Sequence, residues 1–421
     1  MKILIVNPPR FKGLPVIRED RCEIVERNSL LPCISLMQLA SKLKRENDVR
    51  YVDANGFNLS FKDIRDILRR GKYEKVIFRF TPETIDWDMK IARIARLTNK
   101  KILAEAYCFT LKGLEEKIKR KYRVDAINPP IKYDDMPDYS EIPYLPYYSR
   151  GSKKPFTIVY ASRGCPYNCG FCTYARSCYS KRSVFEVYNE LRMLKEIYNL
   201  KSFTFYDATF GADKKYALKL CRKISELKLE WYCNTRSDLV DYDFLEALKS
   251  SGCSGFSLGI ESGSRKILNA LGKSTPETNE KAIILAKEMG FKVHCSFIIG
   301  LPWEDLHTIR ETINFVKKTL PHSAQFNIFV PYPNTALSKP QEKQRFFMTS
   351  QDKPLTSYCS LSTDELRDYR KKMYRLLYTN PKWLAQNITH IIKKPGDFYV
   401  AVRFAYKSLN NLFLKKLEYC H

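Results

Sequence analysis

Three cysteines lie close together in Cys165-Pro166-Tyr167-Asn168-Cys169-Gly170-Phe171-Cys172, at the spacing C-x3-C-x2-C. Thiolates are the ligands of iron–sulfur clusters, and a four-iron cluster usually has four of them. Three closely spaced thiolates can hold three irons and leave the fourth iron open to another ligand. Because Pro166 and Gly170 disfavour helix and strand, we expect this segment to be a loop wrapped around a cluster.

Two other interpretations of these thiols are possible. Buried cysteines can act simply as small hydrophobic side chains. A structural zinc ion would require four ligands, commonly supplied by paired C-x2-C knuckles. The next thiol along the chain, Cys178, has no partner motif of that kind. The spacing therefore favours an iron–sulfur cluster with one open iron.

The segment resembles the cluster loop of the radical S-adenosylmethionine (SAM) enzymes, with Phe171 as the aromatic residue before the last cysteine. The resemblance implies that Cys165, Cys169 and Cys172 bind a 4Fe-4S cluster. It also implies that the amino and carboxylate groups of SAM chelate the open iron. Reductive cleavage of SAM would then give a 5′-deoxyadenosyl radical that abstracts hydrogen.

The composition is that of a globular chain of two or three domains, with 421 residues, 44% hydrophobic and 13% aromatic. No apolar run is long enough for a transmembrane helix. The apolar stretch at the start of the chain is too short for a signal peptide. The ten cysteines outside the loop are scattered singly, which predicts a reducing, cytoplasmic compartment. The net charge of +26 is compatible with a nucleic-acid or membrane partner. Its even spread along the chain favours solvated surfaces instead, so we consider nucleic acid an unlikely partner.

Strands alternate with helices over residues 1–128, which predicts an α/β domain with a Rossmann-like parallel sheet. Ligands of such sheets bind beyond the carboxyl ends of the strands, here at Asn7, Asp53 and Thr81. The expected strands are Lys2–Val6, Arg50–Val52, Lys75–Phe80 and Lys101–Ala104, and the expected helices are Ile34–Arg45, Phe61–Arg70, Ile85–Leu97 and Leu111–Lys121.

This first domain resembles the cobalamin-binding domain that precedes the radical core in one subclass of the family. The phrases Ile3-Leu4-Ile5-Val6-Asn7-Pro8-Pro9-Arg10 and Asp53-Ala54-Asn55 carry the resemblance. The cobalt-ligating motif D-x-H-x-x-G is absent, residues 1–128 contain no histidine, and Ala104-Glu105-Ala106 stands where the family often has Gly-Gly. Two interpretations remain open: base-off cobalamin held without a protein histidine, or a domain that is purely structural.

Three further regions follow in the chain. Residues 129–155 are rich in proline and tyrosine, which predicts an extended linker over the surface between domains. Six strand-then-helix units over residues 156–340 predict a partial (β/α)6 TIM-type radical SAM barrel, with its chemistry at the carboxyl ends of the strands. Residues 341–421 are expected to be helical: a capping box at Ser362 begins one helix, and Phe398–Leu417 forms a basic amphipathic helix. That last helix would cap the barrel mouth or lie on a membrane.

Polar residues at the ends of successive barrel strands are the candidate SAM contacts. Glu261 and Ser262 lie in a phrase that resembles the family's ribose motif, and a carboxylate can accept hydrogen bonds from vicinal hydroxyls. Asp207 matches the position that meets the methionyl amino group, with helix capping as the alternative. Arg236 could pair with the cofactor carboxylate, with a structural salt bridge as the alternative.

The fifth barrel strand ends in Phe297-Ile298-Ile299-Gly300-Leu301-Pro302, which resembles the family phrase that holds adenine. The resemblance assigns Ile299 and Gly300 to that contact, and glycine would allow close backbone approach. Lys273 lies at a position that is frequent in the family, but we interpret it as an exposed lysine.

We therefore expect a radical SAM enzyme with an amino-terminal cobalamin-type domain. The subclass most often transfers methyl groups to unactivated carbons, using SAM both to methylate cobalamin and to supply the radical. The alternatives are cyclisation, coupling or rearrangement without cobalamin, or a basic nucleic-acid- or membrane-binding protein with a structural cluster. The expected partners are a small-molecule, peptide or lipid substrate and an electron donor of the flavodoxin or ferredoxin type.

Overall fold

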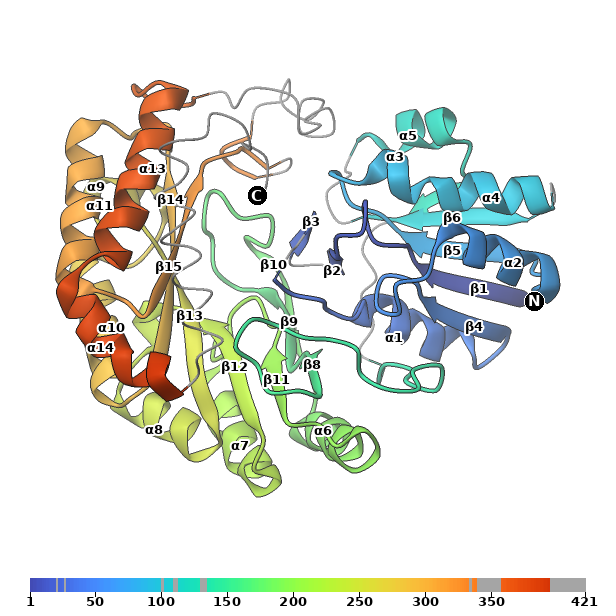
Figure 1. Cartoon of the computed structure of the whole chain (residues 1–421), viewed down its shortest axis with the longest axis horizontal. Helices are drawn as coiled ribbons and strands as arrows, with labels where there is room; N and C mark the ends of the chain where they lie inside the picture. Colours follow the sequence, from blue (N-terminus) through green and yellow to red (C-terminus); the bar gives the residue numbers. More distant parts are fainter. Residues whose placement is uncertain are drawn as a thin grey trace.

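A computed structural model of the chain contains two parallel sheets, each flanked by helices (Figure 1). The structure describes residues 1–19, 22–25, 28–99, 102–108, 113–128, 135–332, 335–338 and 357–393. The predicted order, a Rossmann-like sheet followed by a partial barrel and then helices, is confirmed. The expected helix Phe398–Leu417 lies outside the described residues.

The amino-terminal sheet has five strands in the order β4-β1-β5-β6-β7. All of its pairings are parallel. Its core strands bury nearly every side chain, as expected for a parallel sheet covered on both faces. The strands are β1 (Lys2–Asn7), β4 (Asp48–Asp53), β5 (Lys75–Arg79), β6 (Leu103–Tyr107) and β7 (Ala126–Asn128), and the helices are α1 (Ile34–Leu43), α2 (Phe61–Gly71), α3 (Ile85–Asp88), α4 (Lys90–Thr98) and α5 (Glu115–Tyr122).

A two-stranded hairpin, β2 (Val16–Glu19) and β3 (Cys22–Val25), was not predicted from the sequence. It leaves the sheet after the end of β1 and returns before α1. Figure 1 shows it between the two sheets of the molecule. The hairpin therefore occupies the region beyond the carboxyl ends of the amino-terminal strands.

The second sheet is the predicted partial barrel, with six parallel strands in the order β15-β14-β13-β12-β11-β8. Because neighbouring strands are parallel, their carboxyl ends meet at one edge. The strands are β8 (Phe156–Val159), β11 (Ser202–Phe205), β12 (Glu230–Thr235), β13 (Cys253–Glu261), β14 (Lys292–Ile299) and β15 (Ser323–Ile328).

Helices cover the outer face of the barrel sheet (Figure 1). They are α6 (Val184–Tyr198), α7 (Lys214–Ile224), α8 (Tyr242–Ser250), α9 (Arg265–Leu271), α10 (Pro276–Glu288) and α11 (Leu306–Thr319), followed by α13 (Thr363–Tyr378) and α14 (Pro381–Lys393). Helix α13 begins at the predicted capping box of Ser362. It lies against the last strand, where the hydroxyls of Tyr374 and Tyr378 accept hydrogen bonds from the backbone N–H groups of Phe326 and Ala324, at 3.2 and 3.1 Å. These bonds protect a strand edge that would otherwise be open.

The segment that joins the two sheets lies partly at the surface, where Tyr144 is 60% exposed, and also places some side chains against both domains. Over the described residues 135–155, Tyr147 is fully buried and Tyr139 is 6% exposed. Tyr147 donates a hydrogen bond to Asp53 of the first domain at 2.8 Å, and Tyr139 donates one to Glu190 of the barrel at 2.9 Å. Aromatic side chains with a polar tip can fill an interface and still satisfy their hydroxyls. Pro129 and Pro130 lie outside the described residues.

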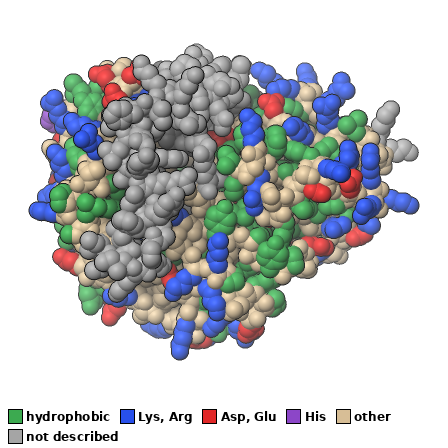
Figure 2. All heavy atoms as spheres, viewed as in Figure 1, with side chains coloured by type: hydrophobic (Ala, Val, Ile, Leu, Met, Phe, Trp, Pro, Cys, Tyr) green, Lys and Arg blue, Asp and Glu red, His purple; other side chains and the backbone are tan. Residues whose placement is uncertain are grey.

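Two observations bear on membrane and basic-surface partners. Within the described ranges, none of the helices is long and apolar enough to cross a bilayer. On the face drawn in Figure 2, Lys and Arg side chains lie over both lobes of the molecule.

Candidate functional site

The cysteine loop begins at the end of a strand rather than as a free loop, which refines the prediction. Strand β9 (Ser162–Cys165) pairs in antiparallel fashion with β10 (Ser177–Lys181). Cys165 is the last residue of β9, and its N–H donates to Ser177 Oγ at 2.9 Å. Gly164 adopts a φ of +75°, and a Cβ there would approach the Cys178 carbonyl oxygen to 1.9 Å. Only glycine fits this turn, which fixes where the first cysteine leaves the hairpin.

Two N–H groups point at sulfur atoms of the loop. Nη1 of Arg236 lies 3.4 Å from Cys169 Sγ, and the backbone N–H of Tyr174 lies 3.4 Å from Cys172 Sγ. The hydroxyl of Thr209 is 3.7 Å from Cys165 Sγ. Hydrogen bonds to cysteine sulfur are a usual feature around iron–sulfur clusters. Each cysteine sulfur thus has a neighbouring polar group of this kind.

Burial determines the acidity of these thiols in the protein alone. It raises the pKa of Cys172 to about 11, and it raises the pKa of Cys169 while the charges of Lys273 and Arg236 act in the opposite direction. A bound metal would favour the thiolate outright. In the part of the chain that the structure describes, no three His, Cys, Asp or Glu side chains converge closely enough for a single metal ion.

The loop is held against the barrel by the turn that follows α9. The N–H of Gly170 donates to the carbonyl of Leu271 at 3.3 Å. Phe171 packs against a small apolar cluster that includes Ile267, Leu271 and Phe329. The cysteine loop consequently lies beside the carboxyl ends of the strands that carry the predicted SAM contacts.

Glu261, the last residue of β13, is 6% exposed and has a φ of +64°. Its Oε1 lies 3.3 Å from Nζ of Lys273, and both side chains are 7% exposed. Lys273 is therefore buried, contrary to the prediction of an exposed lysine. Burial raises the pKa of Glu261, although the charge of Lys273 opposes this shift. The pair places a charged acceptor at the strand end, next to the cysteine loop.

Ser262 and its neighbour Ser264 are fully buried after the same strand. Ser262 Oγ shares a hydrogen bond with Thr312 Oγ1 at 3.0 Å, so its hydroxyl anchors the strand end to α11. Among the described residues, the hydroxyl of Ser264 has no hydrogen-bond partner. A buried polar atom without a partner is costly, and one at a candidate site points to a ligand.

Ile299 is the last residue of β14, as predicted, and Gly300 follows it directly. Gly300 has a φ of +84°, and a Cβ there would approach Leu366 of α13 to 2.9 Å. Its N–H donates to Oε2 of Glu304, which also accepts the N–H of Leu301 at 3.3 Å. Burial raises the pKa of Glu304 to about 7. In the described part of the chain, its other oxygen, Oε1, has no hydrogen-bond partner.

Asp207 follows β11 and is 1% exposed, but its two oxygens are already engaged. They accept the Ala161 N–H at 2.9 Å and the Ser162 hydroxyl at 2.5 Å. Burial raises its pKa to about 6. Asp207 thus fixes the start of β9 to β11, and its contact with the SAM amino group stays a prediction.

Arg236 follows β12 and forms the structural salt bridge that was its alternative interpretation. Its Nε and Nη2 lie 2.9 and 2.8 Å from the two oxygens of Asp238. Its guanidinium also lies over the ring of Tyr167, 4.0 Å from the centroid.

Sequence reasoning missed Glu304 and misjudged Lys273. Glu304 lies four residues after Gly300, which directly follows β14. An acidic residue at that distance could have indicated a carboxylate that accepts the backbone N–H groups of the turn after the strand. For Lys273, the resemblance to the family was a signal of a role, whereas its place two residues beyond the end of α9 does not reveal burial.

The predicted ligand edge of the amino-terminal sheet is filled by the protein itself. Arg18 of the hairpin donates to the side-chain oxygen of Asn7 at 3.2 Å and forms a fully buried ion pair with Asp88 at 2.7 Å. Asp53 accepts hydrogen bonds from Asn7 and Tyr147, both at 2.8 Å. The Thr81 hydroxyl shares a hydrogen bond with Thr84 at 2.9 Å. These strand-end side chains bond to other residues of the protein, and their contact with a corrin stays a prediction.

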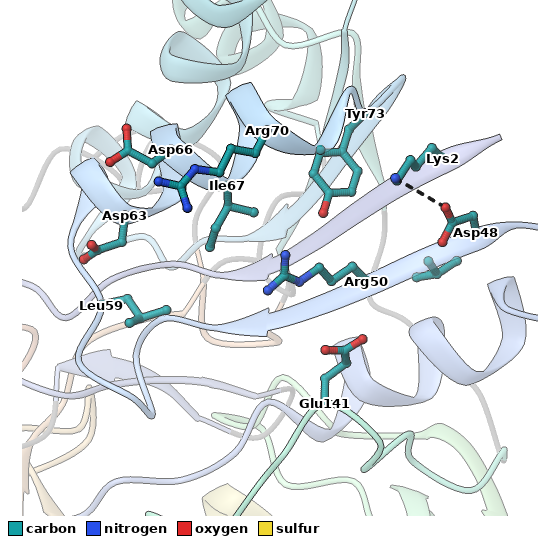
Figure 3. Close-up of a pocket in the computed structure, with 12 residues that line it drawn as sticks. Lys2, Asp48, Arg50, Leu59, Asp63, Asp66, Ile67, Arg70, Tyr73 and Glu141 are labelled. Atoms are coloured by element: carbon teal, nitrogen blue, oxygen red, sulfur yellow. Dashed lines mark ion pairs between the residues drawn. The ribbon is translucent and has the colours of Figure 1, made fainter.

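A cavity of 610 Å³ lies elsewhere on the amino-terminal domain. Figure 3 shows that it is lined by charged side chains of both signs, from the first residues of β1 and β4 and from α2. It includes the Lys2–Asp48 ion pair, 3.6 Å apart. This is the amino end of the strands, opposite to the end where parallel sheets bind ligands. The cavity is separate from the cysteine loop and adds nothing to the candidate chemistry.

Comparisons with known proteins agree with this geometry. Residues 159–316 match the radical SAM superfamily, so the chain contains a radical SAM domain. An uncharacterized methyltransferase of Pyrococcus horikoshii is 28% identical over 92% of this chain and 95% of its own length. An anaerobic magnesium-protoporphyrin IX monomethyl ester cyclase of Rubrivivax gelatinosus is 26% identical over 62% of this chain, which spans only 49% of that enzyme.

The fold of both domains resembles a solved structure. The radical SAM methyltransferase TsrM from Kitasatospora setae, determined with cobalamin and a [4Fe-4S] cluster bound, superimposes with a TM-score of 0.62. The match covers 80% of this chain and 76% of that protein, at 14% sequence identity. The similarity extends beyond the barrel and confirms the two-domain α/β architecture.

Proposed function

We propose that this protein is a radical SAM enzyme that uses a 4Fe-4S cluster and SAM to transfer a methyl group to an unactivated carbon. The observation that carries the proposal is the loop of Cys165, Cys169 and Cys172 at the carboxyl edge of the barrel. Each sulfur there has a polar neighbour within 3.7 Å. When bound, the cluster would supply the electron that cleaves SAM to methionine and a hydrogen-abstracting 5′-deoxyadenosyl radical.

Different residues would bind different groups of SAM. Glu261, kept in place by Lys273, would accept hydrogen bonds from the ribose hydroxyls. Gly300 and Ile299 would face adenine, and Glu304 would hold the turn that presents them. The buried hydroxyl of Ser262 would fix the end of β13 to α11 rather than bind SAM directly. The orphaned Ser264 hydroxyl supports the presence of a ligand at this edge.

Cobalamin as the methyl carrier is supported by relatives rather than by particular residues. The fold is similar to that of TsrM across both domains, and a relative that spans nearly the same length is named a methyltransferase. A corrin would have to lie beyond the hairpin β2–β3, because Arg18 and Tyr147 fill the strand ends. Residues 1–128 contain no histidine, so the bound cofactor should be base-off.

Radical chemistry without cobalamin is the alternative function. The buried Arg18–Asp88 pair at the expected ligand edge favours it, and a relative that is named a cyclase supports a reaction other than methyl transfer. The substrate would be a small molecule, a peptide or a lipid, and a low-potential protein of the flavodoxin or ferredoxin type would supply electrons.

Anaerobic reconstitution with iron and sulfide, with and without hydroxocobalamin, tests both proposals. A radical SAM enzyme should hold about four irons per chain and release 5′-deoxyadenosine from SAM under strong reduction. A cobalamin enzyme should also retain a corrin whose absorbance is unchanged when each of the five histidines is replaced. Four irons with no corrin at saturation would favour the alternative, and the lack of iron would overturn both.

A further inference from the structure

The geometry points to Arg236 as a residue that tunes the cluster through Cys169, rather than as a clamp for the SAM carboxylate. This inference rests on the proposed cluster and concerns how readily that cluster accepts an electron. Arg236 is 8% exposed and lies immediately after β12, at the same edge as Glu261 and the cysteine loop.

The two donors that would clamp a carboxylate are already in use. A bidentate arginine presents Nε and one terminal nitrogen as a parallel pair of donors. In Arg236 these atoms face the two oxygens of Asp238, at 2.9 and 2.8 Å. A SAM carboxylate would have to displace the carboxylate of Asp238. Because Asp238 is only two residues from Arg236 in the chain, its carboxylate loses little entropy on pairing with the guanidinium. The other terminal nitrogen is the one directed at the loop.

That nitrogen, Nη1, lies 3.4 Å from Cys169 Sγ, within the range of an N–H···S hydrogen bond. Tyr167, two residues before Cys169, stacks on the guanidinium with 4.0 Å between the ring centroid and Cζ. The cation is therefore fixed on three sides: by Asp238, by an aromatic ring and by the sulfur. A rigid donor loses little entropy when it forms the bond.

The effect on the cluster follows from its charge. A one-electron reductant adds one negative charge to the cluster without making or breaking a covalent bond in the protein. Hydrogen bonds to the sulfurs and nearby positive charge stabilise the more negative, reduced form. Removing the donor should therefore make the cluster harder to reduce. A hydrogen bond to a charged group contributes about 1.5 kcal/mol or more, which corresponds to about a tenfold change in the ratio of reduced to oxidised cluster.

Arg236→Gln tests this directly, with Arg265→Gln as the matched control. Arg265 is the first residue of α9, and its side chain is 56% exposed and pairs with Glu277. Both variants lose one positive charge, and only Arg236→Gln loses the N–H···S bond. Iron content, the cluster midpoint potential by spectroelectrochemical titration, and the Kd for SAM should be measured for each.

For Arg236→Gln we expect full iron content and a reduced-to-oxidised ratio about tenfold lower at a fixed potential, which is about 59 mV for a one-electron couple. The Kd for SAM should change less than threefold, and Arg265→Gln should match the wild type. An unchanged potential with a Kd raised tenfold or more would overturn the inference in favour of the carboxylate clamp. If the wild type holds no iron, the proposed function itself fails, and this inference fails with it.

A second variant keeps the test decisive if Arg236→Gln does not fold. Asp238→Asn leaves the guanidinium in place but removes the carboxylate that neutralises it. Asp238 is 37% exposed, so the substitution should be tolerated. The reduced cluster should then become easier to form, by a few-fold in the same ratio. A shift in the other direction, or no shift, would contradict the role of Arg236.

Discussion

The carboxyl edges of the two parallel sheets occupy equivalent topological positions but differ in what their polar groups contact. At the barrel edge, three thiols gather next to Glu261 and Lys273, and the hydroxyl of Ser264 is buried without a partner in the described residues. At the amino-terminal edge, Asn7, Asp53 and Thr81 are all hydrogen-bonded within the protein. Topology thus marks both edges as ligand sites, whereas the three strand-end residues predicted to meet a ligand in the amino-terminal domain already bond to other residues of the protein.

The largest expected effect at either edge is the loss of iron when the three loop cysteines are replaced. Replacing Cys165, Cys169 and Cys172 together by alanine should abolish iron binding, because these three thiols are the proposed ligands of the cluster. Cys178→Ala should leave about four irons per chain, since Cys178 is exposed and lies outside the loop. Iron content and the sulfur-to-iron absorbance measure both outcomes. A triple variant that keeps a full cluster would falsify the assignment.

The buried Arg18–Asp88 pair at the amino-terminal edge should contribute to the free energy of unfolding but not to iron binding. Arg18→Met leaves Asp88 buried without its main partner, which should lower the free energy of unfolding by about 3–5 kcal/mol. Urea denaturation measures this loss. Iron content after reconstitution should be unchanged if the two edges act independently.

The matched control is the exposed pair Lys2–Asp48, whose side chains are 43% and 70% exposed. Lys2→Met should cost less than about 1 kcal/mol because exposed ion pairs are well solvated. A double variant, Arg18→Met with Asp88→Leu, should recover much of the lost stability. If Arg18→Met lowers the free energy of unfolding no more than Lys2→Met does, the Arg18–Asp88 pair does not stabilise the amino-terminal domain.

A smaller effect is expected at the candidate ribose contact. Glu261→Gln keeps a neutral acceptor beside Lys273 but removes the charge, so SAM binding should weaken by about 1.5–3 kcal/mol. Equilibrium binding to the reconstituted protein gives the Kd, and iron content is the control for an intact loop. An unchanged Kd would return Glu261 to a structural role as the partner of Lys273.

The sequence predicted whole elements well because periodicity and caps are local properties. The capping box at Ser362 begins α13 as expected, and six barrel strands occur where apolar runs precede polar phrases. The expected helix Ile85–Leu97 divides into α3 and α4 at Met89, which no local signal indicates. The cysteine spacing identified the loop because its chemistry needs no distant residue.

What the sequence did not reveal depends on contacts between distant segments. The ion pair Arg18–Asp88 joins residues 70 positions apart, and Tyr147 reaches Asp53 across 94 positions. Nothing in the sequence around Arg18 or Tyr147 indicates that these polar side chains are buried. For Arg236 the sequence left two interpretations open, a SAM carboxylate contact and a structural salt bridge, and the structure forms the salt bridge with Asp238.

The smallest expected effect concerns Glu304, and it appears as a pH dependence. Burial raises the pKa of Glu304 in the folded protein to about 7, above its ordinary value of 4.5. The folded state therefore binds this proton more tightly than the unfolded state between about pH 4.5 and 7, and stability falls as the pH rises through that window. Glu304→Gln removes the titration while its carbonyl oxygen can still accept the N–H groups of Gly300 and Leu301. The variant should be more stable than the wild type by about 1–3 kcal/mol at pH 8, and this advantage should shrink toward pH 5.

The neighbouring Asp305 supplies the control for this experiment. The Thr308 N–H lowers the pKa of Asp305 to about 2, so the carboxylate contributes stability above its unfolded pKa that is lost as the pH falls through 2. Asp305→Asn should therefore change nothing in the slope of stability against pH between 5 and 8. Urea denaturation across this range measures both slopes. If Glu304→Gln shows the same slope as the wild type, Glu304 is already ionised at pH 5, and its second oxygen must have a partner, such as an ordered water, that stabilises the charge.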